Sequence, residues 1–218
     1  MAQSVVIIDY GSGNLRSAEK ALVRAAEASH RDFVVSVTSD PEHVRKADRL
    51  VLPGVGAFAD CRQGLLSIAG MKEAIYEVAR EKANPFLGIC VGMQLLATSG
   101  EEHGSHAGMG WIDGIVKAIE PTNESLKIPH MGWNEVTLTD TGRKHPVASA
   151  LTAGDHAYFV HSYHMDVADA GYLLATTEYG NALTAIVGRD NIIGSQFHPE
   201  KSQAVGLTFL RAFLEWQI

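Results

Sequence analysis

The first half of the chain alternates between continuous apolar runs and segments with a helical period. The apolar runs, typical of strands buried on both faces, are residues 5–8, 33–37, 50–52 and 85–89. A helix is predicted over residues 71–81. Another lies between the first two runs, and the positions that share one of its faces are Leu15, Ala18, Leu22 and Ala25. Because strands alternate with helices, we expect an α/β fold with a mainly parallel, doubly wound sheet and helices on both faces.

The second half is richer in strand signals, which predict additional antiparallel strands. These runs are residues 133–138, 158–160, 173–177, 183–187 and 192–196. A turn at residues 189–191 predicts a hairpin between the last two. A helix is also expected to start at Met93, shortly after the fourth apolar run. The positions of helical spacing in the tail, which should close the core, are Val205, Phe209, Leu210 and Phe213.

Length and composition narrow the classes of protein to consider. The chain has 218 residues, of which 46% are hydrophobic and 20% charged, so we expect a single globular domain over residues 1–218. A net charge of -7 argues against non-specific binding to nucleic acid or to an anionic membrane. Two cysteines are too few for a disulfide framework, and the N-terminus lacks a secretory pattern, so a cytoplasmic location is expected. No apolar run is long enough to cross a bilayer.

One cysteine has an unusual local setting. Cys90 lies between Gly88 and Gly92, after a predicted strand and before a predicted helix. A nucleophile on such a corner is held in a tight, strained turn where only small neighbours fit. The N-terminus of the following helix favours a thiolate. The alternative is a small buried hydrophobe beside two turn glycines.

A second segment, about 100 residues later, supplies possible partners for a nucleophile. A predicted strand runs into His198, and Glu200 follows two residues on. Residues two apart in an extended chain point the same way, so His198 can face the cysteine while Glu200 orients the imidazole. Nucleophile, base and orienting carboxylate follow the logic of a catalytic triad. Cys90, His198 and Glu200 are therefore the predicted catalytic residues.

With both motifs the chain resembles the class I (triad) glutamine amidotransferases, over nearly its whole length. The resemblance implies glutamine as substrate, attack by Cys90 on the side-chain amide and a glutamyl thioester intermediate. It implies an oxyanion hole made by the N–H of Val91 and by one N–H of Gly54, Val55 or Gly56. Val91 departs from the larger side chain common at that position. The residues that the resemblance assigns to substrate binding are Gln94 and, through their backbone, His161, Ser162 and Tyr163.

Four further segments resemble the branch of this family that serves histidine biosynthesis. They are residues 52–58, 129–134, 159–163 and 197–202. That branch implies a heterodimer with a (β/α)₈-barrel cyclase subunit, which receives ammonia before it is protonated. No cofactor is implied. The residues expected at the partner interface or along the ammonia route are Asn14, Trp133, Tyr158 and Lys201.

Other interpretations remain. Residues 129–134 disfavour an amidotransferase of another pathway. The short spacing of His198 and Glu200 disfavours a cysteine peptidase or esterase. The complete triad disfavours a non-catalytic binding protein. Residues 11–14 fail the dinucleotide-binding pattern. Residues 103–106 have metal-like spacing but no partner ligands, so no metal is expected. Cys61 is expected to be inert, and His161 and His164 structural. Whether Glu101 or Glu102 touches substrate stays open.

Overall fold

The computed structural model describes residues 2–123 and 125–218, and its centre is an eight-stranded sheet. Five strands are parallel to their neighbours, in the order β2-β1-β3-β4-β14, and β13, β12 and β9 continue the sheet in antiparallel fashion. The parallel strands are β2 (Phe33–Thr38), β1 (Gln3–Ile8), β3 (Arg49–Gly54), β4 (Phe86–Cys90) and β14 (Ile192–Ser195). The others are β13 (Ala182–Arg189), β12 (Leu173–Glu178) and β9 (Thr137–Leu138).

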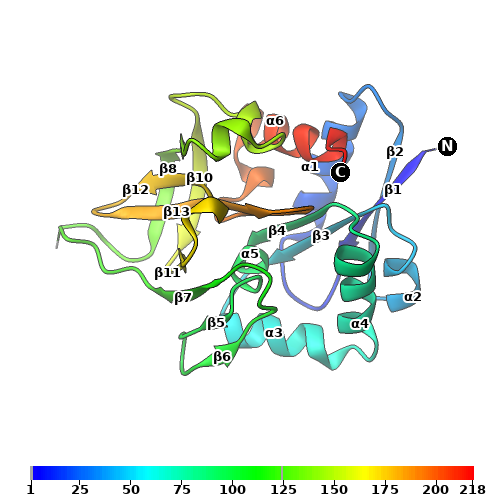
Figure 1. The fold of residues 1–218 in the computed structure, drawn as a ribbon, viewed down its shortest axis with the longest axis horizontal. Coiled ribbons are helices and arrows are strands. Elements are labelled where there is room, and N and C mark those ends of the chain that lie inside the picture. The colour runs from blue at the N-terminus through cyan, green and yellow to red at the C-terminus, as the bar shows by residue number, and fades with distance from the viewer. Residues whose placement is uncertain (1, 124) are drawn as a thin grey trace.

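Helices cover both faces of the parallel part (Figure 1). On one side α1 (Leu15–Glu27) packs against the last helix, α6 (Gln203–Glu215). On the other side lie α3 (Phe58–Ser67) and α4 (Met71–Tyr76), and the short α2 (Pro41–Val44) contacts α4. The expected α/β fold is thus confirmed. Connections between parallel strands are right-handed, so the direction of each step along the sheet decides which face its helix covers. The connection β1-α1-β2 and the connection β3-α3-α4-β4 step in opposite directions, so α1 lies on one face and α3 and α4 lie on the other.

Two smaller sheets flank the antiparallel end of the large one. The first pairs β8 (His130–Glu135) with β10 (His156–His161). The second has the order β11-β7-β5-β6. Its strands are β11 (Tyr163–Val167), β7 (Gly114–Ala118), β5 (Ser99–Gly100) and β6 (His106–Ala107). Figure 1 shows these strands gathered on the side away from α2 and β2.

The predicted strands of the large sheet, the hairpin before β14 and the closing helix α6 are confirmed. On α1 the buried residues include Ala18, Leu22 and Ala25, and on α6 they include Phe209, Leu210 and Phe213. The helix over residues 71–81 is confirmed: α4 covers Met71–Tyr76, and a π-helical turn over Glu77–Glu81 continues it.

Two expectations are wrong in detail. The strand expected over residues 133–138 begins earlier and is divided into β8 and β9 at Val136. The helix expected from Met93 is a single turn, α5 (Val91–Gln94). It ends because the carbonyls of Leu95, Leu96 and Ala97, which a longer helix would use, accept hydrogen bonds from residues 109–112. Across residues 2–123 and 125–218, the helices are too short or too polar to cross a membrane.

Candidate active site

Cys90 ends β4 on a sharp elbow. Its φ of 54° and ψ of -112° lie outside the regions that a residue with a side chain ordinarily adopts. The two glycines around it allow close backbone approach. A Cβ at Gly88 would lie 2.6 Å from the carbonyl oxygen of Gly92, and one at Gly92 would overlap the carbonyl oxygen of Leu52. The G-x-C-x-G pattern therefore follows from steric crowding at the elbow.

The pairing of β14 with β4 brings the second motif to this elbow. The two strands are parallel and Ser195 lies beside Ile89, so the next residues along, Gln196 and Cys90, are also neighbours. The Gln196 side chain donates from Nε2 to Cys90 Sγ at 3.6 Å. His198 follows two residues later, and its backbone N–H donates to the Tyr158 carbonyl at 3.0 Å.

His198 and Glu200 form a buried pair. The His198 Nδ1 lies 2.7 Å from Glu200 Oε1, and the two side chains are 2% and 3% exposed. Burial lowers the pKa of His198, but hydrogen bonding and charge interactions with Cys90 and Glu200 outweigh it and raise the pKa to about 9. The imidazole is therefore protonated at neutral pH, and its charge favours a thiolate at Cys90. The structure thus brings the three predicted catalytic residues together.

The predicted substrate residues meet next to this group. Gln94 is buried, and its Nε2 donates to the Tyr163 carbonyl and to Gln196 Oε1, both at 3.0 Å. His161 Nδ1 lies 2.9 Å from the same Tyr163 carbonyl. The Ser162 carbonyl accepts from the N–H of Ile119 at 2.9 Å. With both N–H bonds of its amide in use, Gln94 has its Oε1 left to accept a hydrogen bond.

His161 also contacts a second buried histidine. Its Nε2 lies 3.0 Å from His130 Nδ1, and His130 stacks between Phe159 and Tyr179. Burial lowers the pKa of His130 to about 4 and that of His161 to about 3, so both are neutral at pH 7. Burial likewise lowers the pKa of His164, although His164 takes part neither in the contact between His161 and His130 nor in the stacking of His130.

The loop after β3 is fixed by hydrogen bonds to Ser12 and Cys61. The Val55 N–H donates to Ser12 Oγ at 3.1 Å, and the Val55 carbonyl accepts from Ser12 Oγ at 2.6 Å and from Cys61 Sγ at 3.3 Å. Of the expected oxyanion donors, the Val55 N–H is therefore already engaged. Gly54 pairs directly with Cys90, and Gly56 has a φ of 96°, which suits a backbone that can rotate.

The two glutamates left open by the sequence differ in their contacts. Glu102 Oε2 accepts from the backbone N–H of Phe58 at 2.7 Å, just after the loop that follows β3. Glu101 instead lines a cavity of about 520 Å³, together with Tyr163 and His164.

Three of the four expected interface residues form one cluster. Tyr158 and Trp133 are paired across β10 and β8, with ring centroids 6.1 Å apart, and Lys201 Nζ lies 5.7 Å from the Tyr158 ring. Trp133 is 48% exposed. Asn14 lies elsewhere, directly before α1, where its side chain makes no capping hydrogen bond.

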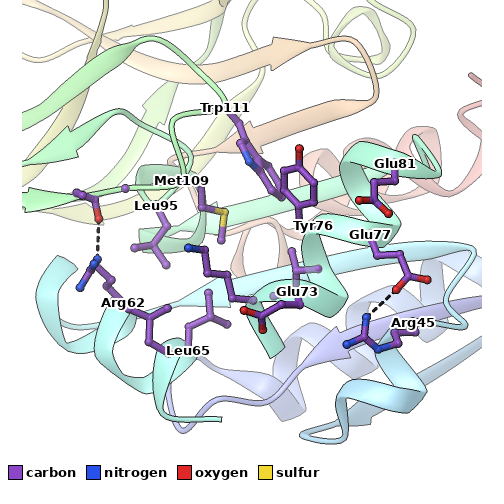
Figure 2. Close-up of a pocket in the computed structure, with 15 residues that line it drawn as sticks. Arg45, Arg62, Leu65, Glu73, Tyr76, Glu77, Glu81, Leu95, Met109 and Trp111 are labelled. Carbon is purple, nitrogen blue, oxygen red and sulfur yellow. Dashed lines mark hydrogen bonds and ion pairs between the residues drawn. The ribbon is translucent and has the colours of Figure 1, made fainter. Parts of the chain in front are cut away.

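Another cavity, of about 600 Å³, lies away from this site (Figure 2). Figure 2 shows Trp111, Tyr76 and Met109 on its walls, between α3, α4 and the segment before β7. Arg45 and Glu77 are paired at its edge, with Nη1 and Oε2 2.6 Å apart. None of the three predicted catalytic residues lines it, so it is separate from the candidate active site. In the described part of the chain no cluster of His, Cys, Asp and Glu is arranged to hold a metal.

The sequence interpretation missed Gln196, Ser12 and His130. Gln196 carried a usable signal, because it lies two residues before His198 in an extended segment and therefore points the same way. Ser12 and His130 carried none, because each acts through a contact with a residue more than 30 positions away.

Comparison with known proteins agrees with this geometry. The glutamine amidotransferase class-I family matches residues 6–215. A curated relative from Rhodospirillum rubrum, "Imidazole glycerol phosphate synthase subunit HisH", is 58% identical over 97% of this chain and 98% of its own. A protein of the same name from Bradyrhizobium diazoefficiens is 57% identical over 98% of this chain and 99% of its own.

Solved structures share the fold at low sequence identity. One described as "Crystal structure of glutamine amidotransferase" has a TM-score of 0.69 at 18% identity, covering 96% of this chain and 97% of that one. The glutaminase domain of Trypanosoma brucei CTPS with bound acivicin has a TM-score of 0.67 at 17% identity, covering 100% and 96%. Taken with the near full-length match to the family, these findings show that the chain belongs to the class I glutamine amidotransferases, in the group that includes the HisH subunits.

Proposed function

We propose that the protein is the glutaminase subunit of an imidazole glycerol phosphate synthase. It hydrolyses glutamine with Cys90, His198 and Glu200, and it passes the ammonia to a (β/α)₈-barrel cyclase subunit. The observation that carries this proposal is the Cys90 elbow of positive φ beside a buried His198–Glu200 pair with a 2.7 Å contact. The names of the full-length relatives supply the pathway.

The proposed chemistry begins with the proton of Cys90 on His198. The thiolate attacks the side-chain amide carbon of glutamine, and a C–S bond forms while the carbonyl oxygen becomes an oxyanion. His198 gives its proton to the departing nitrogen as the C–N bond breaks, which releases ammonia and leaves a glutamyl thioester. Water, deprotonated by His198, then cleaves the thioester to glutamate. Glu200 keeps Nδ1 of the imidazole protonated and oriented throughout.

The oxyanion would be held by the Val91 N–H and by one N–H from the loop of Gly54, Val55 and Gly56. A donor of this kind typically contributes about 10²–10³ in rate. The hydrogen bond from the Val55 N–H to Ser12 Oγ must open before this N–H can serve. We therefore expect low activity from the isolated chain.

Substrate binding is proposed for Gln94 and for the backbone of His161, Ser162 and Tyr163. The Gln94 amide is oriented by the Tyr163 carbonyl, so its Oε1 is available to the α-ammonium group of glutamine.

The cyclase is proposed to bind over the cluster of Trp133, Tyr158 and Lys201, with Asn14 near the ammonia route. Exposed aromatic residues such as Trp133 are enriched at protein interfaces, and Lys201 lies beside the neighbouring Tyr158 ring. A separate acceptor is required because free ammonia is protonated at neutral pH and is then no longer nucleophilic.

We also propose that residues 1–218 form a single domain in the cytoplasm. Strands from both ends of the chain, β1 and β14, share one sheet, and α1 packs on α6. Both cysteines are free thiols, in line with a reducing compartment.

The test is glutamate release by the purified chain, alone and with a barrel cyclase subunit and its nucleotide ligand. Low activity alone and a large rise with both are expected. If the rate of glutamate release does not rise with an active cyclase, the protein would instead be assigned as the glutaminase subunit of another synthase. Cys90→Ser should abolish turnover, and a retained rate would refute the triad.

Labelling by an alkylating glutamine analogue provides an independent control. It should be lost in Cys90→Ser and kept in Cys61→Ser, because the Cys61 side chain is fully buried. Turnover of peptides or esters without turnover of glutamine would instead indicate a cysteine peptidase or esterase.

A further inference from the structure

A side-chain amide that the triad chemistry leaves unused contacts the nucleophile directly. Gln196 is completely buried, and its Nε2 lies 3.6 Å from Cys90 Sγ. Its Oε1 accepts from Gln94 Nε2 at 3.0 Å. Its backbone is fixed as well, because the Gln196 N–H donates to the Ala185 carbonyl of β13 at 2.8 Å. The amide is thus held on both sides against the sulfur.

The orientation of this amide follows from a single backbone carbonyl. The Tyr163 oxygen can only accept hydrogen bonds, so the Gln94 group facing it must be the NH₂ group. The second N–H of that group then requires an acceptor, and only the Oε1 end of Gln196 can supply one. The NH₂ end of Gln196 is therefore the end that faces Cys90.

The other contact of the Tyr163 carbonyl reinforces this polarity. His161 Nδ1 also faces that oxygen and must carry its hydrogen, so His161 Nε2 accepts from His130 Nδ1. Two donors then occupy the two lone pairs of the Tyr163 oxygen. Gln94 cannot turn its oxygen inward without placing it against the carbonyl, and reversing Gln196 would oppose two NH₂ groups.

We propose that Gln196 is a positioning residue whose amide N–H holds the Cys90 sulfur and favours its thiolate form. The inference rests on the proposed glutaminase function, in which that thiolate is the attacking group. A hydrogen bond to a charged acceptor is stronger than one to a neutral acceptor, so the donor stabilises sulfur more once the proton has gone to His198. The amide does not titrate, so it remains a donor at every pH.

The experiment measures the rate of Cys90 alkylation by iodoacetamide against pH, with the modified site identified by mass spectrometry. In Gln196→Met, which keeps the length of the side chain but lacks the donor, we expect the alkylation profile to move to higher pH by about one unit, which slows alkylation by up to about tenfold on the rising part of the profile. Ser195→Ala is the matched control. It removes a neighbouring buried hydrogen bond, from Ser195 Oγ to the Phe197 carbonyl, and should leave the profile unchanged.

A second variant keeps the test decisive if Gln196→Met does not fold. Gln196→Leu differs in shape but likewise lacks an N–H donor to the sulfur, so alkylation should again slow and its profile should shift to higher pH. Both variants should also lower kcat of cyclase-activated glutamine hydrolysis. A wild-type alkylation profile in a folded variant, or a change in KM alone, would overturn the inference.

Failure of this inference is distinguishable from failure of the proposed function. Alkylation reports on the Cys90 sulfur without any glutamine turnover. A shifted profile in a protein that releases no glutamate would therefore refute the glutaminase and leave the role of Gln196 in holding the sulfur intact.

Discussion

The buried pair of His130 and His161 should make the protein sensitive to mild acid. The two rings are 2% and 6% exposed, and their nitrogens lie 3.0 Å apart. Burial lowers their pKa values to about 4 and about 3, against 6.5 for an ordinary histidine. The unfolded chain therefore binds more protons than the folded one below pH 6.5. By linkage, the free energy of unfolding falls as the pH drops from about 6.5 towards the folded pKa values.

The magnitude follows from the two pKa shifts. Each histidine contributes a slope of up to about 1.4 kcal/mol per pH unit within this window. Between pH 7 and pH 5 the loss is about 2 kcal/mol for each ring and about 4 kcal/mol for both. That is a large part of a stability that for most domains is about 5–15 kcal/mol.

The assay is urea unfolding at pH 7, 6 and 5, in wild type and in His130→Gln. The variant keeps an N–H that can reach His161 but removes one titrating group, so its loss between pH 7 and pH 5 should be about 2 kcal/mol smaller than that of wild type. Its stability at pH 7 is also lower, because the stacking on Phe159 and Tyr179 is reduced, but the comparison uses only the pH slope.

His156→Gln is the matched control, because the His156 side chain is exposed. It should show the wild-type slope. Equal slopes in wild type and His130→Gln would refute the reasoning, since they would mean that His130 does not stay neutral in the folded protein.

Two further outcomes are expected at the active site. Gly92→Ala should destabilise the protein by at least about 1–3 kcal/mol in chemical denaturation, because its Cβ would overlap the Leu52 carbonyl; unchanged stability would contradict the crowding at the elbow. By NMR, His198 should titrate near pH 9, and this midpoint should fall in Glu200→Gln and in Cys90→Ser. Because the folded pKa is raised, the stability that His198 contributes is present below about pH 6.5 and is lost as the pH rises through 9.

The large sheet could be predicted because its parallel strands have continuous apolar runs, which in β3, β4 and β14 reflect burial on both faces; the edge strand β2 is only partly buried. β8 carries no such signal, since Met131 and Trp133 are exposed while His130 is buried. The helix expected at Met93 failed for a tertiary reason, the capture of its carbonyls by residues 109–112. The local sequence pattern thus predicts a helix or strand correctly only where the surrounding structure requires the same helix or strand.

The same distinction separates the predicted and unpredicted parts of the site. Cys90, His198 and Glu200 lie in short motifs whose internal spacing already constrains their geometry. The hold of Ser12 on Val55 joins residues 43 positions apart, and the contact of Gln196 with Cys90 joins residues 106 apart. The sequence around Gln196 indicates that its side chain points the same way as that of His198. The register that brings Gln196 to Cys90, however, is encoded by no pattern in either segment alone.

The register itself is fixed at the opposite ends of the strands. Phe86, the first residue of β4, donates its N–H to the Asn191 carbonyl at 2.9 Å. The Asn191 side chain, which is 2% exposed, donates to the carbonyls of Ala79 and Asn84, both at 2.7 Å. Asn191 thereby ties the hairpin turn to the segment that leads into β4.

From that anchor, β14 pairs with β4 residue by residue, from Ile192 beside Phe86 to Ser195 beside Ile89. A slip of one residue would reverse the side chains along β14 and turn Gln196 away from Cys90. The geometry at the sulfur is therefore set by polar contacts at the amino ends of two strands whose carboxyl ends lead to the proposed catalytic residues. This explains why a site split between two distant motifs can be held within hydrogen-bonding distance by a rigid sheet and needs no flexible loop to join it.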